Sequence, residues 1–376
     1  MKSILLTSTA LIAFGGAALA EAHGDAAGVS FSGSAALGYN DDVEGGFYWD
    51  GNIAVSMSAA LNGGVTASAT FDADFADNNL GEDLVAGGYV LSLSSANANL
   101  EFGDVDPAAD RHWDDVSGME FAGFNDVDVH IASGEVDSDG DGEVTDDDPA
   151  LFDAVLYGNA TFGGVTGAIS YGVTAGGDID AMQLAAVGTF GNFGVVVAYQ
   201  DETALADAVI GVTGTASVAG ADIKVSYGDD GAETSTGIGV SYPVGPVVVG
   251  GYYTMNDVAE DNYGVSADYT SGPIAVSAFY DVDGDEAGDS DGTEFGVEGS
   301  YDVGNGLTVL AGFINTTAAG ADEEATNAYY VAGTYDLGGG AELLVSYAED
   351  EANATNDEIG DPEYMHGTTV EVSFSF

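Results

Sequence analysis

The sequence contains no cysteine and almost no basic residues. Its 376 residues include 3 Lys and Arg against 64 Asp and Glu. The lack of cysteine excludes disulfides and every site that depends on a thiolate. The lack of basic residues argues against nucleic acid or an anionic surface as a partner. After residue 20 there is no apolar run of about 18 residues, so no transmembrane helix is expected.

The first twenty residues have the features of a secretory signal. Lys2 provides a positive start, residues 4–20 are apolar and small, and Ala18, Leu19 and Ala20 fit a cleavage site. We predict a signal peptide over residues 1–20 and a mature chain over residues 21–376; the alternative is a retained N-terminal anchor. Cleavage would leave Arg111 and Lys224 as the only Lys or Arg side chains.

The remainder of the chain alternates between apolar and small polar residues. In residues 295–301, Phe295, Val297 and Tyr301 share one face, and Glu298 and Ser300 share the other. The same period of two occurs in residues 263–269 and 364–376, where Tyr364, His366 and Thr368 are expected on the apolar face. This pattern predicts β-strands with one face in contact with water. The 57 Gly and only 6 Pro also suggest many strands and few helices. The 19 Tyr, 17 Phe and 45% hydrophobic residues argue against disorder.

Short and long connections follow one another along the chain. Tight turns are predicted at residues 62–64, 96–97, 163–164, 191–192, 219–220, 243–245, 271–272, 302–306 and 336–340. Longer acidic connections are predicted at residues 77–83, 175–180, 201–207, 228–233, 256–261, 281–291, 316–324 and 349–363. This asymmetry is typical of transmembrane barrels with short periplasmic turns. The predicted fold is an all-β, antiparallel, up-and-down transmembrane barrel of about 16 to 20 strands.

Aromatic residues recur at both ends of the predicted strands. One set precedes the tight turns: Phe162, Phe190, Tyr242, Tyr269, Tyr301 and Tyr335. A second set precedes the acidic loops: Tyr199, Tyr227, Tyr253, Tyr280 and Tyr347. Two such rows indicate the interface girdles of a membrane barrel. The alternative is that they are ordinary strand aromatics.

The segment 104–153 interrupts the alternation and is the candidate constriction of the barrel. An aperiodic segment this long is uncommon unless it is functional, so we predict that it is the third external loop and folds into the lumen. The candidate constriction residues are Asp104, Asp106, Asp110, Arg111, Asp114, Asp115 and, on the lumen face of a strand, Lys224. Arg111 is expected either to face acids across the pore or to pair with Asp110 or Asp114.

Residues 137–148 resemble a calcium-binding loop of the EF-hand or dockerin type. The predicted ligands are Asp137, Asp139, Asp141, Glu143 (through its carbonyl), Thr145 and Asp148. Gly142 falls where such a loop turns sharply, whereas Asp148 stands where Glu is usual. The pattern predicts a structural Ca²⁺, and the alternative is a solvated acidic run.

Three stretches resemble the general porins of Gram-negative bacteria, most closely the alphaproteobacterial, Rhodobacter-like porins. They are residues 29–39, which resemble a first strand, residues 99–106, which resemble a fifth strand entering the third loop, and the terminal Phe376. The resemblance implies a homotrimer of water-filled barrels in the outer membrane, in contact with lipid and lipopolysaccharide. It also implies passive diffusion of small hydrophilic solutes and ions.

The chain departs from these porins in one respect that bears on function. General porins face the acids of the inward loop with a cluster of Arg and Lys, whereas this chain has only Arg111 and Lys224 for that role. The lumen is therefore expected to carry a field of one sign that favours cations.

The sequence shows no catalytic constellation, so no enzyme is predicted. His23, His112, His130 and His366 lack the spacing of metal ligands or of a nucleophile–base pair. A barrel-embedded hydrolase therefore has no support. The main alternative is a secreted or surface-exposed acidic calcium-binding β-structural protein. It would account for the signal, the acidity and the calcium loop, but not for the girdles or the terminal Phe376.

Overall fold

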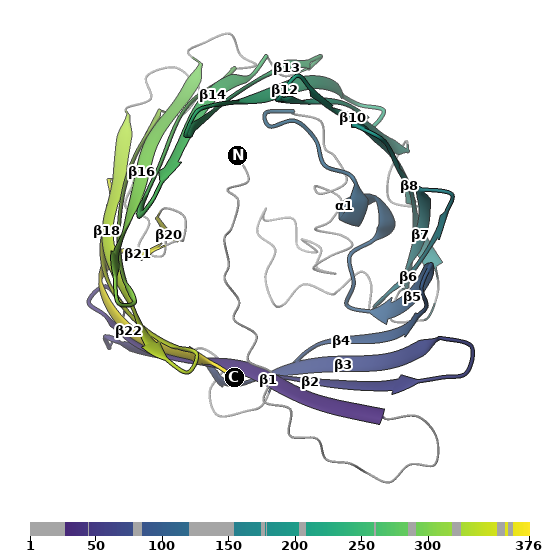
Figure 1. Ribbon diagram of the computed structural model, residues 1–376, viewed down its shortest axis with the longest axis horizontal. Coiled ribbons are helices and arrows are strands. Elements are labelled where there is room, and N and C mark those ends of the chain that lie inside the picture. Colours follow the sequence, from purple (N-terminus) through teal and green to yellow (C-terminus); the bar gives the residue numbers. More distant parts are fainter. Residues whose placement is uncertain are drawn as a thin grey trace.

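The strands form one closed antiparallel barrel. The computed structural model describes residues 27–43, 45–77, 85–119, 154–173, 177, 179–202, 208–258, 261–284, 291–317, 325–351, 358–359 and 364–376. Twenty strands form a single sheet, in which each strand pairs with its neighbour in the chain. The first strand also pairs with the last, which closes the ring seen in Figure 1. The predicted fold class is thus confirmed, with the strand number at the upper end of the expected range.

The barrel strands run alternately up and down. They are β1 (Ala27–Asn40), β2 (Phe47–Ala60), β3 (Thr66–Asp77), β4 (Val85–Ser94), β5 (Ala98–Gly103), β6 (Ala154–Phe162), β7 (Val165–Val173), β8 (Ile179–Phe190), β9 (Phe193–Glu202), β10 (Val209–Val218), β11 (Ala221–Asp229), β12 (Thr234–Val244), β13 (Val247–Asn256), β14 (Tyr263–Ser271), β15 (Ile274–Asp283), β16 (Gly292–Gly304), β17 (Leu307–Thr317), β18 (Thr326–Gly338), β19 (Ala341–Asp350) and β22 (Gly367–Ser375).

The apolar face of these strands points away from the lumen. On β16, Phe295, Val297 and Tyr301 are 43%, 47% and 49% exposed. Across the sheet, Val297 lies opposite Ala278 on β15 and Phe313 on β17, so the apolar positions form continuous rows. An apolar surface this extensive on the outside of a closed barrel is what contact with lipid requires.

The connections and girdles also follow the prediction. The turn between β16 and β17 contains Asn305 and Gly306, whose φ angles are 57° and 86°, as a tight hairpin turn requires. Most of the predicted girdle aromatics have large exposed fractions outside the barrel: Phe162, Phe190, Tyr227, Tyr242, Tyr253, Tyr280, Tyr301, Tyr335 and Tyr347.

The prediction for the start of the last strand is wrong. Gly367, with a φ of 86°, interrupts the extended backbone, so the residues before it do not continue the alternation of β22. Tyr364 is only 3% exposed, and its ring centre lies 4.7 Å from that of Tyr330 on β18. His366 lies 2.9 Å (Nδ1) from Asp42 Oδ2 instead of on the lipid face. A short hairpin, β20 (Glu358–Ile359) and β21 (Tyr364–Met365), lies inside the ring in Figure 1.

Two predicted segments lie outside the described residues, namely the signal peptide over residues 1–20 and the calcium loop over residues 137–148. In the part of the chain that is described, no helix is long and apolar enough to cross a bilayer.

Candidate functional site

The chain enters the lumen at the end of β5. Gly103 has a φ of 130°, which a residue with a side chain rarely adopts, and a Cβ there would collide with the Tyr89 carbonyl. The next residue, Asp104, donates its N–H to the same carbonyl oxygen at 2.8 Å. The glycine therefore allows the chain to leave the sheet while its first free N–H stays bonded.

A short helix, α1 (Ala108–His112), follows and lies inside the barrel next to β8 (Figure 1). The first N–H groups of any helix lack partners within the helix. Here the barrel wall supplies them: Ser170 Oγ accepts from Ala108 at 2.8 Å, and Gln183 Oε1 accepts from Ala109 at 2.7 Å and Asp110 at 3.2 Å. Ser170 and Gln183 are each 1% exposed. These two side chains of the barrel wall thus cap the N-terminus of α1.

The underside of the loop segment is apolar and packs on small wall residues. Ala108 and Ala109 are fully buried, and Val116 is 3% exposed. Ala109 packs with Ala198 and Val209 of the wall. Because the wall is lined with alanine here, the helix backbone can approach it closely. Carboxylates of the segment lie on its opposite side, toward the water of the lumen. The side chains of Asp106 and Asp114 are 69% and 63% exposed.

Further along, polar side chains of the wall bind the carbonyl groups of the segment. Thr213 Oγ1 donates to the Asp114 carbonyl at 2.9 Å. The Gly118 carbonyl accepts from Thr254 Oγ1 at 2.7 Å and from Asn262 Nδ2 at 3.0 Å. Residues 104–119 therefore follow the inner wall from β5 to the end of β13. The predicted inward folding of the third loop is confirmed for these residues, whereas residues 120–153 lie outside the described part of the chain.

Arg111 returns toward the strand from which the loop departs. Its Nη1 lies 2.6 Å from Glu101 Oε2 on β5, and its Nε lies 3.9 Å from Asp106 Oδ2. Its guanidinium is stacked 4.0 Å above the centre of the Tyr157 ring on β6, which is a cation–π contact. The sequence predicts either acids across the pore or Asp110 or Asp114 as partners of Arg111, and the structure adds Glu101, which α1 brings within reach.

His112 also contacts Tyr157, through Nε2 at 2.8 Å from the phenol oxygen. Burial lowers the pKa of His112, and the positive charge of Arg111 lowers it further. The imidazole is therefore neutral at neutral pH and adds no positive charge to the lumen.

Lys224, on β11, reaches from the wall to the loop. Its Nζ lies 2.6 Å from Asp114 Oδ2, so Asp114 pairs with Lys224 and not with Arg111. The Lys224 side chain is 26% exposed, so this pair is partly desolvated. Arg111 and Lys224 thus both hold the loop segment against the barrel.

The inner wall carries many carboxylates besides those of the loop. By strand register these occupy the lumen face: Asp222, Asp268, Asp281, Glu294, Glu298, Asp302, Asp336, Glu342 and Glu371. Among the described residues, no group of three or more acidic or histidine side chains is arranged to hold a metal ion. The predicted ligands at residues 137–148 lie outside that set.

Sequence reasoning missed the neutral residues that fix the loop. Gln183 and Gln200 are both buried, and Gln183 Nε2 donates to Gln200 Oε1 at 2.8 Å. The period-two pattern of the sequence places both glutamines on the lumen face of adjacent predicted strands. Their side chains are larger than the Ser and Thr expected beside a water-filled lumen. Their size is the sequence feature that could have indicated a contact with the loop.

A closed barrel with an apolar exterior, an acidic lumen and a loop fastened inside it defines a β-barrel channel. A sequence model of the Gram-negative porin family matches residues 7–313 and 249–355. The chain belongs to this family, and it is a non-enzymatic diffusion channel of the Gram-negative outer membrane.

Solved structures that match the chain include a porin and another outer membrane protein. A mutant of the Rh. blastica porin is 18% identical, with a TM-score of 0.40, and the match covers 93% of this chain and 100% of that one. A loop-deletion mutant of OmpT, an outer membrane protein of Vibrio cholerae, is 14% identical, with a TM-score of 0.41 and coverage of 94% and 100%. No curated protein sequence matches the chain.

Proposed function

We propose that this channel passes small hydrophilic solutes and favours cations over anions. The observation that carries the proposal is the pairing of Arg111 and Lys224, the Arg and Lys side chains of the described residues. Arg111 lies against Glu101 and Lys224 against Asp114, both at 2.6 Å. Each positive charge is balanced by one carboxylate, so the remaining carboxylates of the lumen give the field along the pore one sign.

The strength of that field follows from screening. At about 0.15 M salt the Debye length is about 8 Å, so wall and loop carboxylates act on ions in the lumen. Cations are concentrated there and anions are excluded, because low-dielectric walls focus the field into the water-filled space. At about 1 M salt the screening length falls to about 3 Å, and the preference weakens.

A planar-bilayer recording tests this proposal. With a KCl gradient across the membrane, the reversal potential reports which ion is more permeant. We expect a reversal potential whose sign shows that K⁺ is more permeant than Cl⁻. The magnitude of this potential should fall when both solutions are made more concentrated. A reversal potential near zero, or with the sign for Cl⁻, would refute the cation preference.

We also propose that the barrel assembles as a homotrimer in a membrane of lipid and lipopolysaccharide. Resemblance to the general porins supports this assembly. Chemical crosslinking in native outer membranes tests it, with a species of three chains as the expected product. A product limited to single chains would contradict it.

A structural Ca²⁺ in residues 137–148 is a further proposal. It rests on the ligand spacing of Asp137, Asp139, Asp141 and Asp148 in the sequence, since carboxylate oxygens are the ligands that Ca²⁺ prefers. The ion would stiffen residues 137–148.

A further inference from the structure

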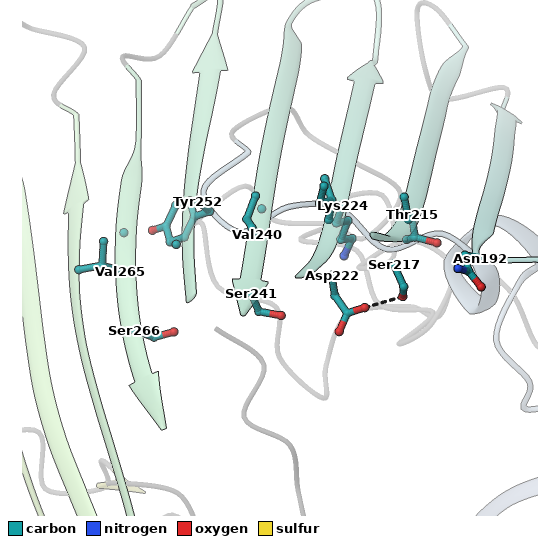
Figure 2. A pocket seen from close by; sticks show the side chains of 15 residues that line it. Asn192, Thr215, Ser217, Asp222, Lys224, Val240, Ser241, Tyr252, Val265 and Ser266 are labelled. Carbon is teal, nitrogen blue, oxygen red and sulfur yellow. Dashed lines mark hydrogen bonds between the residues drawn. The ribbon is translucent and has the colours of Figure 1, made fainter. Parts of the chain in front are cut away.

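A pocket with a volume of about 470 Å³ lies on the inner wall of the barrel, over β10 to β14. Figure 2 shows the side chains around it. Its floor is low at Gly239, which has no side chain, whereas the ring of Tyr252 and the carboxylate of Asp281 cover Gly264. Tyr252 lies between the two glycines in register. The loop borders it, since a Cβ on Gly239 would lie 3.7 Å from Val116.

The pocket presents charges of both signs. Lys224 and Asp222 are two residues apart on β11 and face the same way, so their Cα atoms are about 7 Å apart. Asp222 Oδ1 accepts a hydrogen bond from Ser217 at 2.5 Å. An ammonium group has three donors, and the contact with Asp114 needs only one of those on Lys224.

Hydroxyl groups surround this charged pair. Thr215 and Ser217 are contributed by β10, Ser241 by β12 and Ser266 by β14, all of them lining the pocket. Thr215 lies opposite Lys224 in the sheet, and Ser217 and Ser241 lie on either side of Asp222. Figure 2 shows the ammonium of Lys224 and the carboxylate of Asp222 on the same side of the sheet, with Ser217 beside them.

We propose that this pocket is a subsite for small zwitterionic solutes of the amino acid class. The solute carboxylate pairs with Lys224, its ammonium pairs with Asp222, and the hydroxyls bind its remaining polar groups. This inference rests on the proposed diffusion function and names a solute class for it. The volume lies in the range of small-molecule sites, about 300–1,000 Å³.

The charges explain why a zwitterion fits better than a simple ion. A monovalent anion would enter a lumen of carboxylates, and a monovalent cation would meet Lys224 next to Asp222. A solute that carries both signs satisfies both groups and has no net charge to be repelled. The site is open to water, so the binding is weak, and a solute must leave readily for it to be transported.

Liposome swelling with size-matched solutes tests the subsite. L-threonine is the zwitterionic probe, and erythritol is an uncharged probe of similar size. The measured quantity is the ratio of the two permeation rates. We expect Asp222→Asn to lower this ratio about two- to fivefold, the effect of losing one partly exposed ion pair.

The matched control is Asp268→Asn. Asp268 is also a lumen-facing carboxylate, accepts a hydrogen bond from Ser277 at 2.7 Å and lies outside the pocket. The Asp268→Asn substitution removes the same charge from the lumen without changing the pocket. We therefore expect the ratio of threonine to erythritol permeation to stay at the wild-type value. Equal losses in the two variants would overturn the subsite, because a general change of field would then explain both.

A second variant removes the pocket without changing charge. Ser241→Leu places an apolar side chain beside Asp222, and we expect the same loss of threonine preference as in Asp222→Asn. Swelling by erythritol reports that the channel is folded and open. Unchanged ratios in both pocket variants, with erythritol still permeant, would overturn the subsite alone. If liposomes that contain the wild-type channel admitted neither solute, the diffusion function itself would be refuted.

Discussion

The Nζ of Lys224 lies 2.6 Å from Asp114 Oδ2, joining the barrel wall to the loop inside it. In a lumen with so many carboxylates, a single wall lysine could serve as a fixed positive charge for passing ions. Here it pairs with a carboxylate of the loop, so the pair itself has no net charge. The pair therefore acts on the position of the loop segment, and under the proposed function the remaining carboxylates set the sign of the lumen field.

Lys224→Gln should weaken the docking of the loop segment on the barrel wall. The pair is partly exposed, so its loss should cost about 0.2–1 kcal/mol of loop docking free energy. Single-channel recordings should show more frequent current fluctuations than the wild type at the same voltage. Lys224→Arg keeps the charge and is the control. Equal noise in all three channels would show that the ion pair does not restrain the loop.

Gln183→Leu should destabilise the inward loop more strongly. The substitution removes the buried acceptor of two helix N–H groups, at Ala109 and Asp110. Leaving such groups unsatisfied costs about 1–3 kcal/mol. Thermal unfolding in detergent should show a lower midpoint. Thr161→Val, which removes an exposed hydroxyl pair with Thr166, is the control and should change the midpoint little. A Gln183→Leu midpoint equal to that of the control would contradict this account of how α1 is held.

Arginine should be tolerated on one face of the strands and not on the other. Val297 is 47% exposed on the outside of β16, and Ser300 lies on the lumen face of the same strand. Val297→Arg should cost about 2–4 kcal/mol if it lies near the bilayer midplane, and Ser300→Arg much less. Reversible unfolding by denaturant in lipid vesicles measures both. Similar costs would be inconsistent with lipid on the outer face.

The barrel could be predicted from the sequence because its determinants are local. Alternation assigns a face to each residue of a strand, and the girdle aromatics and glycine turns mark where strands end. Tyr364 shows the limit of this reasoning. A period of two places it on the lipid face, but the positive φ of Gly367 changes the parity, and the ring lies inward on Tyr330.

The caps of α1 could not be predicted, because Ser170 and Gln183 lie 62 and 74 positions away in the chain from the N–H groups whose hydrogen bonds they accept. From the sequence, Arg111 is expected either to face acids across the pore or to pair with Asp110 or Asp114. The structure shows that α1 directs the guanidinium of Arg111 back to Glu101, over the ring of Tyr157. Which wall residues cap α1 depends on how the loop crosses the strands, and nothing local encodes that path.

Chelation of the proposed Ca²⁺ should loosen residues 137–148. The proposed ligands Asp137, Asp139, Asp141 and Asp148 would repel one another without the ion. Limited proteolysis with and without a chelator, followed by mapping of the cut sites, measures this. More cleavage between Val136 and Pro149 is expected after chelation. Identical cleavage would remove calcium from the account.

The reversal potential of charge-neutralised channels tests the central claim, that the acids of the inward loop set the selectivity. The loop variant replaces Asp106, Asp110 and Asp115 by Asn, and the control replaces Glu349, Asp350 and Glu351, at the outer end of β19, by Gln or Asn. Both remove the same number of charges. In a KCl gradient near 0.15 M, where the Debye length is about 8 Å, we expect the loop variant to lose more of the potential for K⁺. Equal shifts in the two variants, or a wild-type channel that favours Cl⁻, would contradict the account.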